Sequence, residues 1–202
     1  DPNSELACSL IKRDALASVQ HFICTEPGTV PAAECAFDDL LAAEPVPVAE
    51  VDPDDLAALI FTSGTAGSPR AAMLSHGNLQ SNLDQSSTTD GIKENDVVYG
   101  VLPLFHIFGL NVVIGLGLAR GATLVLVQRF DPFTALETIR ERKVTIIPGA
   151  PPLWLAFSHM EDMSQFPADS FATVRLALTG AAKMPEEAQR RLKERFGLSL
   201  LE

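Results

Sequence analysis

The chain has 202 residues, of which 47% are hydrophobic and 20% are charged, a composition typical of a globular domain with a core of its own. Its formal net charge of −11 disfavours nucleic acid and anionic membrane surfaces as partners. The three cysteines match no metal-ligand spacing, and no secretory signal opens the chain, so we expect a reduced, cytoplasmic protein. The longest apolar stretch, residues 107–119, is shorter than the roughly 20 residues of a transmembrane helix.

Both ends of the chain resemble sequence added by cloning. Asp1-Pro2-Asn3-Ser4 resembles translated vector sequence, and Leu201-Glu202 resembles the scar that precedes a purification tag. We therefore expect residues 5–200 to be part of one domain that is incomplete at both ends.

Apolar runs alternate with helical patterns along the chain. Residues 17–25 are the first predicted strand, and residues 42–53, rich in proline and acidic side chains, predict an extended connection. The later strands are expected at residues 57–61, 97–102, 122–127, 144–147 and 174–178. The helices between and after them are expected at residues 75–85, 107–118, 133–142, 152–159 and 185–196.

Two of these helices carry clear boundary signals. Asp131 is a suitable N-cap and Pro132 a suitable first helical residue, and Gly197 is expected to end the last helix. Strands without polar alternation, separated by helices of about ten residues, predict a parallel sheet that is covered on both faces. The fold class is therefore α/β.

Residues 61–70, Phe-Thr-Ser-Gly-Thr-Ala-Gly-Ser-Pro-Arg, follow a predicted strand and suit phosphate binding. Gly64 and Gly67 let backbone N–H groups approach an anion, neighbouring hydroxyls add donors, and Arg70 supplies a permanent positive charge. A turn that merely joins two elements is the alternative on composition alone. The pattern G-x-x-x-x-G-K-S/T of P-loop nucleotidases does not fit.

Residues 61–78 resemble the signature Y/F-T-S-G-T-T-G-x-P-K-G-V of the adenylate-forming enzymes, which include acyl- and aryl-CoA synthetases, firefly luciferase and the adenylation domains of peptide synthetases. Residues 103–109, Pro-Leu-Phe-His-Ile-Phe-Gly, resemble that family's P-x-F-H-x-x-G motif, and residues 178–182, Leu-Thr-Gly-Ala-Ala, resemble its adenine-binding segment. The resemblance implies part of the N-terminal αβαβα domain of such an enzyme. Ala66, Arg70 and Ala71-Ala72 depart from the signature, although arginine keeps the charge of the usual lysine.

The resemblance implies a reaction in which a carboxylate attacks the α-phosphorus of ATP and pyrophosphate leaves, so that positioning and charge neutralisation supply most of the acceleration. The residues expected to hold the departing phosphates are Thr62, Ser63, Gly64, Thr65, Gly67, Ser68 and Arg70. Thr65 is also the candidate for a hydroxyl near Mg²⁺, and Arg70 is counted as catalytic.

The other two motifs imply the rest of the site. Gly180, Ala181 and Ala182 are expected to line adenine, and His106 is expected to lie beside the acyl carboxylate and the α-phosphate. Without the motif, a histidine between two apolar residues is more typical of packing. Residues 107–118 and 146–154 are candidates for the acyl pocket, with ordinary core as the alternative. No acid or amide stands out that would recognise an amino group, which favours a fatty or aryl acid over an amino acid.

We therefore expect part of an ATP-dependent fatty-acid–CoA ligase, with CoA as co-substrate. A fatty acyl-AMP ligase that passes the acyl group to a carrier protein and a non-catalytic nucleotide-binding domain are the alternatives. The family's Tyr-Gly-x-Thr-Glu and Thr-Gly-Asp motifs and its lysine-bearing C-terminal domain have no counterpart in these residues. We accordingly expect the chain alone to make no acyl-adenylate, and we expect its unpaired strand edges to favour a homodimer.

Overall fold

The structure is a computed structural model that describes residues 21, 23–24, 35–62, 70–86, 91–160, 167 and 169–202. The chain divides into two compact units, Asp1–Glu50 and Val51–Glu202. In the first unit, the short parallel strands β1 (Ile23–Cys24) and β2 (Cys35–Ala36) precede helix α2 (Phe37–Leu41). The predicted strand at residues 17–25 is confirmed at Ile23–Cys24; residues 17–20, 22 and 25 lie outside the described part. Residues 42–53 contain no helix or strand, as the predicted connection requires.

The second unit begins with an antiparallel hairpin of strands β3 (Leu56–Thr62) and β4 (Arg70–Ser75). The sequence predicted β3 but not β4, which lies between the predicted phosphate loop and the predicted helix at residues 75–85. Residues 70–75, Arg-Ala-Ala-Met-Leu-Ser, contain no β-branched or aromatic side chain, so cross-strand pairing, and not local propensity, makes them a strand.

Helix α3 (His76–Ser86) follows β4 directly, close to its predicted bounds. Two reciprocal hydrogen bonds define its start: the Asn78 N–H donates to Ser75 Oγ at 3.2 Å, and the Ser75 N–H donates to Asn78 Oδ1 at 3.1 Å. This arrangement is a capping box with asparagine in the place of the usual glutamate or glutamine.

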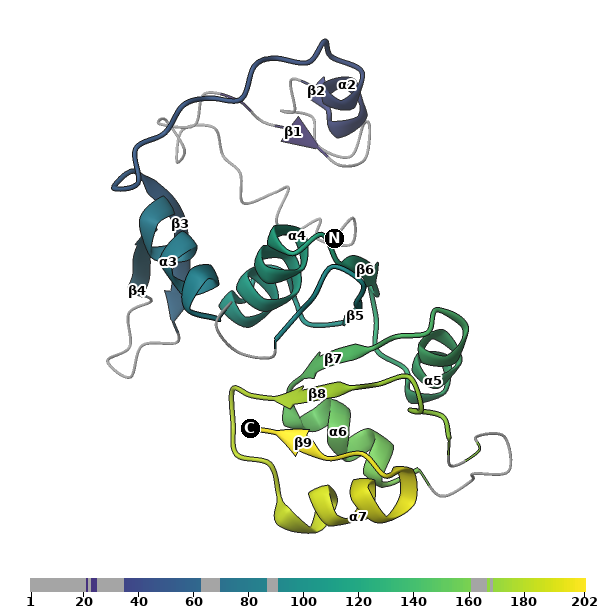
Figure 1. Cartoon of the computed structure of the whole chain (residues 1–202). Coiled ribbons are helices and arrows are strands. Elements are labelled where there is room, and N and C mark those ends of the chain that lie inside the picture. The colour runs from purple at the N-terminus through teal and green to yellow at the C-terminus, as the bar shows by residue number, and fades with distance from the viewer. Residues whose placement is uncertain are drawn as a thin grey trace, which may run out of the picture. The chain divides into compact units, whose positions relative to one another are not determined.

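The central sheet has five parallel strands in the order β6–β5–β7–β8–β9 (Figure 1). Their bounds are β5 Val97–Gly100, β6 Thr123–Leu126, β7 Ile146–Gly149, β8 Leu176–Thr179 and β9 Leu200–Leu201. The α/β class and the parallel sheet are thus confirmed, and the first four of these strands were predicted to within two residues at each end. The two-residue strand β9 was not predicted.

Helices cover both faces of this sheet. Helices α5 (Pro132–Glu141), α6 (Pro151–Ser158) and α7 (Glu186–Phe196) share the larger core with Tyr99 and Ile147. The neighbouring strand residues Val98 and Ile146 belong to a second cluster with Leu116, on the opposite face. That face is covered by η2 (Gly109–Leu116), which continues as α4 (Gly117–Ala119).

Local signals set most helix ends. The Asp131 carboxylate accepts the Thr134 N–H at 2.9 Å, Pro132 is the first residue of α5, and α7 ends at Gly197 with φ +67°, all as predicted. Element η2, expected as an ordinary α-helix, is a π-helix with a wider turn. Among the residues described, no helix combines the length and the apolar character that crossing a lipid bilayer demands.

An ion pair between a buried aspartate and a partly exposed arginine joins the loops at the amino edge of the sheet. Asp96 precedes β5, Thr145 precedes β7 and Arg175 precedes β8. The Asp96 carboxylate accepts hydrogen bonds from Arg175 Nε at 2.8 Å, from Arg175 Nη2, and from Thr145 Oγ1 at 2.7 Å. Burial by itself raises the pKa of Asp96, but these bonds and one from the Lys93 N–H outweigh it and lower the pKa to about 2.

Candidate active site

Three loops meet the carboxyl edge of the sheet, opposite the Asp96 ion pair. Residues 101–109 follow β5, Ala150 follows β7, and residues 180–182 follow β8. Because the three strands are parallel neighbours, the loops after them emerge at the same edge, where open α/β sheets bind their ligands. Two of the three motifs found in the sequence are therefore brought to one place by topology alone.

The loop after β5 turns tightly and presents His106. A Cβ atom at Gly109 would lie 2.2 Å from the Pro103 carbonyl oxygen, so only glycine fits where the chain folds back on itself. The His106 N–H donates to that same oxygen at 3.0 Å. The motif's proline-to-glycine spacing thus has a structural reason that is independent of catalysis.

The imidazole of His106 is exposed, so the interpretation of this histidine as a packed residue is wrong. Its Nδ1 accepts the Phe108 N–H at 3.1 Å. A neutral imidazole whose Nδ1 accepts must carry its proton on Nε2. That Nε2–H is a donor suited to a carboxylate or phosphate oxygen.

The loop after β8 has an unusual backbone. The Gly180 N–H donates to the Gly149 carbonyl at 3.3 Å, and Ala181 has φ +69°, which costs a residue with a Cβ about 1–2 kcal/mol. The preceding Thr179 hydroxyl is buried, and within the described part it is the one buried side-chain oxygen without a hydrogen-bond partner. Ala181 and Ala182 are exposed, so their backbone is open to a flat ligand.

These two loops are in contact. A Cβ atom at Gly180 would lie 3.2 Å from Cε1 and from Cζ of Phe108. The segment expected to line adenine therefore packs against the segment that carries His106. The absence of a side chain at Gly180 is what permits this approach.

The predicted phosphate loop connects the two strands of the hairpin, and the structure describes its two flanking residues, Thr62 and Arg70. Thr62 pairs with Arg70 in the β3–β4 ladder, and Thr62 Oγ1 donates to the Arg70 carbonyl at 3.3 Å. Both residues are exposed. Residues 63–69 lie outside the described part, and with them Ser63, Gly64, Thr65, Gly67 and Ser68, so the phosphate-binding and Mg²⁺ roles of these residues stay predictions.

The hairpin is linked to the site loops through α3. The Asn111 Nδ2–H of η2 donates to Asn82 Oδ1 of α3, and a Cβ at Gly115 would lie 2.9 Å from Leu83 Cδ2. Asn111 is buried although it interrupts an apolar run, and the sequence pattern gave no reason to select it. Its partner on a helix 29 residues away is that reason.

The predicted acyl-pocket segment at residues 146–154 is mostly core, as its alternative interpretation held. All four residues of β7 are buried, and Leu153 and Trp154 are buried with them. Trp154 Nε1 donates to the Leu178 carbonyl at 3.1 Å. A largely apolar cavity of about 380 Å³ lies instead on the η2 face, lined by Val112, Leu116 and Leu178 and, toward the amino edge of the sheet, by Gly91 and Arg175.

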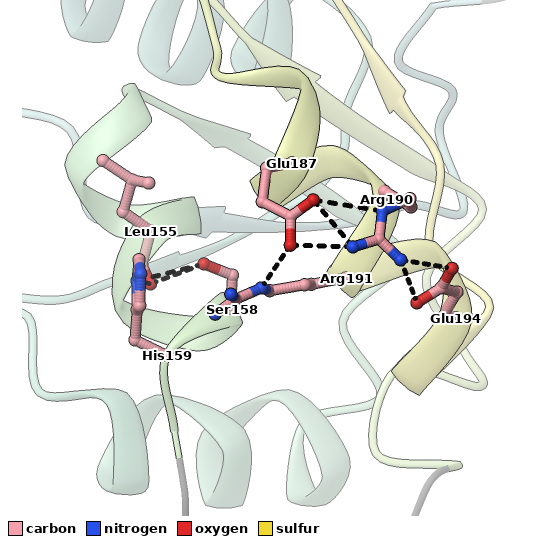
Figure 2. A network of polar contacts seen from close by, with 7 residues as sticks. All are labelled: Leu155, Ser158, His159, Glu187, Arg190, Arg191 and Glu194. Carbon is pink, nitrogen blue, oxygen red and sulfur yellow. Dashed lines mark hydrogen bonds and ion pairs between the residues drawn. The ribbon is translucent and has the colours of Figure 1, made fainter.

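A polar cluster on α6 and α7 contains a serine beside a histidine, but it does not form a nucleophile and a base (Figure 2). His159 Nδ1 lies 3.2 Å from Ser158 Oγ and 2.7 Å from the Leu155 carbonyl oxygen. A carbonyl only accepts, so Nδ1 carries the proton and cannot remove one from Ser158. The rest of the cluster consists of ion pairs with helical spacing on the exposed side of α7: Glu187, Arg190, Arg191 and Glu194.

Comparisons with known proteins agree with this geometry. The chain is 36% identical over 173 residues to a 4-coumarate–CoA ligase of Humulus lupulus, covering 82% of this chain and 31% of that protein. It is 30% identical to a long-chain-fatty-acid–CoA ligase of Bacillus subtilis (strain 168), covering 77% of this chain and 28% of that protein. The chain thus spans about a third of the length of the curated relatives it matches.

Solved structures show the same fold. A malonyl-CoA ligase in a ternary product complex with methylmalonyl-CoA and AMP has a TM-score of 0.74 and 25% identity, covering 91% of this chain and 41% of that one. ATP-bound MatB from Rhodopseudomonas palustris has a TM-score of 0.72 and 26% identity, covering 83% of this chain and 35% of that one. A sequence profile described as "AMP-binding enzyme" matches residues 3–202. The chain therefore belongs to the AMP-binding enzyme family and forms part of an acyl-CoA-ligase-like N-terminal domain.

Proposed function

We propose that the whole protein is an ATP-dependent acid–CoA ligase. A carboxylate oxygen attacks the α-phosphorus of ATP, and the bond from that phosphorus to the oxygen of the leaving pyrophosphate breaks. The sulfur of CoA then attacks the acyl carbon, and AMP leaves. The observation that carries the proposal is the contact at the carboxyl edge between the His106 loop and the Gly180 loop in a chain of the AMP-binding family.

The described residues support specific roles in the first step. The partly exposed Gly180 and the exposed Ala181 and Ala182 form a platform for adenine, and the small side chains let the ring lie flat on it. His106 Nε2–H donates to the acyl carboxylate or to an α-phosphate oxygen, where it offsets negative charge as two anions approach. Both roles require only groups that are already oriented.

The hairpin loop supplies the site for the departing pyrophosphate in this proposal. Thr62 and Arg70 flank residues 63–69, and Arg70 has no ion-pair partner among the described residues. A guanidinium in that position is available to a phosphate. Thr65 is the proposed hydroxyl near Mg²⁺, and the roles given to His106 and to the adenine platform do not depend on that ion.

The acid has an apolar fatty or aryl body in this proposal, with a fatty acid as the first choice. The relatives named above act on 4-coumarate and on long-chain fatty acids by their names, which supports both classes. The apolar cavity on the η2 face is the space available for such a body. The helix η2 contributes no charged side chain to this cavity, and Arg175 lines its amino-edge end.

Alanine variants of the phosphate loop test the proposal in the whole protein. We expect Thr62→Ala, Thr65→Ala and Arg70→Ala together to reduce acid-dependent pyrophosphate release at least 100-fold, on the order expected when charge stabilisation is lost. Arg142→Ala, an exposed arginine at the end of α5, is the matched control and should leave the rate unchanged. Unchanged pyrophosphate release in the triple variant contradicts the ligase assignment.

A panel of acceptors and acids sharpens the assignment. CoA and an acyl carrier protein are offered separately, with fatty and aryl acids of increasing length. Thioester formation on the carrier alone would identify an acyl-AMP ligase instead. ATP binding without acid-dependent pyrophosphate release would identify a nucleotide-binding domain without catalysis.

We also propose that the chain associates as a homodimer through the hairpin. Leu59 and Met73 are cross-strand partners and Phe61 lies on the same face; their exposed fractions are 50%, 70% and 71%. A two-stranded ribbon with such a face is marginal when it stands alone. We expect Phe61→Ser with Met73→Ser to shift the chain toward monomer in multi-angle light scattering, and a wild-type chain that is monomeric at high concentration contradicts the idea.

A further inference from the structure

One residue, Phe108, contacts both His106 and the loop after β8, the first through its backbone and the second through its ring. The Phe108 N–H donates to His106 Nδ1 at 3.1 Å, which orients the imidazole. The Phe108 ring packs on the α-carbon of Gly180, where an added Cβ would lie 3.2 Å from Cε1 and Cζ. Phe108 therefore connects the histidine to the adenine platform directly.

The platform is held in a conformation that its own residues disfavour. Ala181 has φ +69°, a region that residues with a Cβ rarely adopt. Thr179 Oγ1 is buried without a partner in the described part of the chain. Two unfavourable features within three residues show that contacts from outside the segment hold it in place.

Few contacts are available for that purpose. The Gly180 N–H reaches the Gly149 carbonyl, but at 3.3 Å this hydrogen bond is long. Ala181 and Ala182 are exposed and pack on little. The ring of Phe108 is the close side-chain contact at the centre of the segment.

We propose that Phe108 is a positioning residue that clamps residues 180–182 in their strained conformation, ready for adenine, while its backbone N–H fixes the tautomer of His106. This inference rests on the proposed function. When the ring is removed, Ala181 is free to relax to negative φ, and the flat platform is lost. The adenine of ATP and the carboxylate of the acid are then no longer held in a fixed position relative to each other.

Hydrogen exchange on the chain without nucleotide tests the clamp itself. We expect amides in residues 179–182 to exchange about tenfold faster in Phe108→Ala, and at the unaltered rate in Phe108→Tyr, which keeps the ring. Phe105→Ala is the matched control, because Phe105 belongs to the same loop but is 86% exposed. Unchanged exchange of residues 179–182 in Phe108→Ala overturns the inference. If that variant does not fold, Phe108→Leu serves in its place, with the same expectation.

AMP titration then measures how the effect of removing the Phe108 ring depends on the residue at position 181. Trp154 is the only tryptophan, and its Nε1 donates to the Leu178 carbonyl, so its fluorescence reports on this segment. We expect Phe108→Ala to weaken AMP binding about tenfold when residue 181 is alanine, but threefold or less when it is glycine. Glycine adopts positive φ without restraint and so needs the clamp less.

An equal loss in both backgrounds contradicts the clamp, because a merely structural role gives additive effects. Restoration of affinity by Phe108→Tyr supports it. The proposed function fails if the whole protein releases no pyrophosphate in the presence of acid, whereas the exchange measurement decides separately whether Phe108 holds the segment.

Discussion

At the amino edge of the central sheet, a buried carboxylate ties three loops together, whereas at the carboxyl edge the loops after the same strands carry glycine, alanine and an exposed histidine. The buried Asp96 pairs with the partly exposed Arg175, and Thr145 is a third partner. At the other edge, Ala181 and Ala182 are exposed, and Thr179 has a buried hydroxyl without a hydrogen-bond partner among the described residues. The same strands thus end in an electrostatic tie on one side and in strained backbone on the other.

The contrast shows that contacts important for stability and groups suited to ligand binding lie at opposite edges of the same sheet. Charge-assisted hydrogen bonds at the amino edge align β5, β7 and β8, and they do not occupy the carboxyl edge, where the candidate site lies. The carboxyl loops can hold a strained backbone because the amino-edge hydrogen bonds already align the strands. Substitutions at the two edges should consequently affect different measurements.

The largest effect is expected from a substitution at the carboxyl edge, and it should fall on the reaction rate and not on stability. In the whole protein, His106→Ala should reduce acid-dependent pyrophosphate release about 100-fold or more, because the oriented Nε2 donor is lost. The free energy of unfolding should change by less than about 0.5 kcal/mol, since the side chain is exposed. His76→Ala, an exposed histidine at the start of α3, is the control. Equal rates for both variants would remove His106 from the mechanism.

At the amino edge the effect should fall on stability. Asp96→Asn removes the charge of a buried carboxylate that accepts several hydrogen bonds, two of them from Arg175, so we expect the free energy of unfolding to fall by about 3 kcal/mol. AMP affinity of the folded protein should not change. Urea unfolding and AMP titration measure the two quantities, and Glu187→Gln, which breaks exposed pairs on α7, should have little effect on either. A loss of AMP affinity in Asp96→Asn would show that the two edges are coupled.

Acid should act on the same group with a somewhat smaller effect. The pKa of Asp96 is lowered from 3.8 to about 2 in the folded protein, so its carboxylate stabilises the fold fully above about pH 4. This contribution, about 2 kcal/mol, is lost as the pH falls from about 4 to about 2. Unfolding by urea at a series of pH values measures it. Asp96→Asn should abolish this part of the slope, and a slope that persists in the variant assigns it to other carboxylates.

The smallest effect concerns strain at the amino edge. Lys143, in the turn before β7, has φ +52°, and glycine adopts that conformation without the clash of a Cβ. Lys143→Gly should raise the free energy of unfolding by about 0.5 kcal/mol, because the relief of strain exceeds the entropy that glycine loses. Lys183→Gly, at a residue with negative φ, should bring no gain in the same urea experiment. A gain of equal size there would attribute the effect to lost charge and not to backbone strain.

Local signals were sufficient for most of the fold. Apolar runs predicted four strands of the parallel sheet, and Asp131 and Gly197 predicted two helix ends, because a cap acts within a few residues of itself. Strands β4 and β9 escaped prediction since their residues become strands only through a partner. The π-helical turn of η2 has no local signature in an apolar, glycine-containing run.

Some residues of the candidate site could likewise be predicted from local sequence, and others could not. His106 and residues 180–182 were found from motifs, which are contiguous in sequence. Phe108 and the Asp96–Arg175 pair were not, because their roles depend on partners that are distant in the chain, 79 residues in the case of the ion pair. Neither a phenylalanine in an apolar segment nor a single aspartate carries a local sign of such a role.

By itself, the sequence determined the α/β class, the family and the residues whose chemistry suits adenylate formation. Tertiary structure alone decided that Gly180 lies under a phenylalanine ring and that a buried carboxylate ties the opposite edge. The physical reason is range. Propensities, caps and motifs act over a few neighbouring residues, whereas parallel strands bring together loops whose positions in the chain give no indication that they will meet.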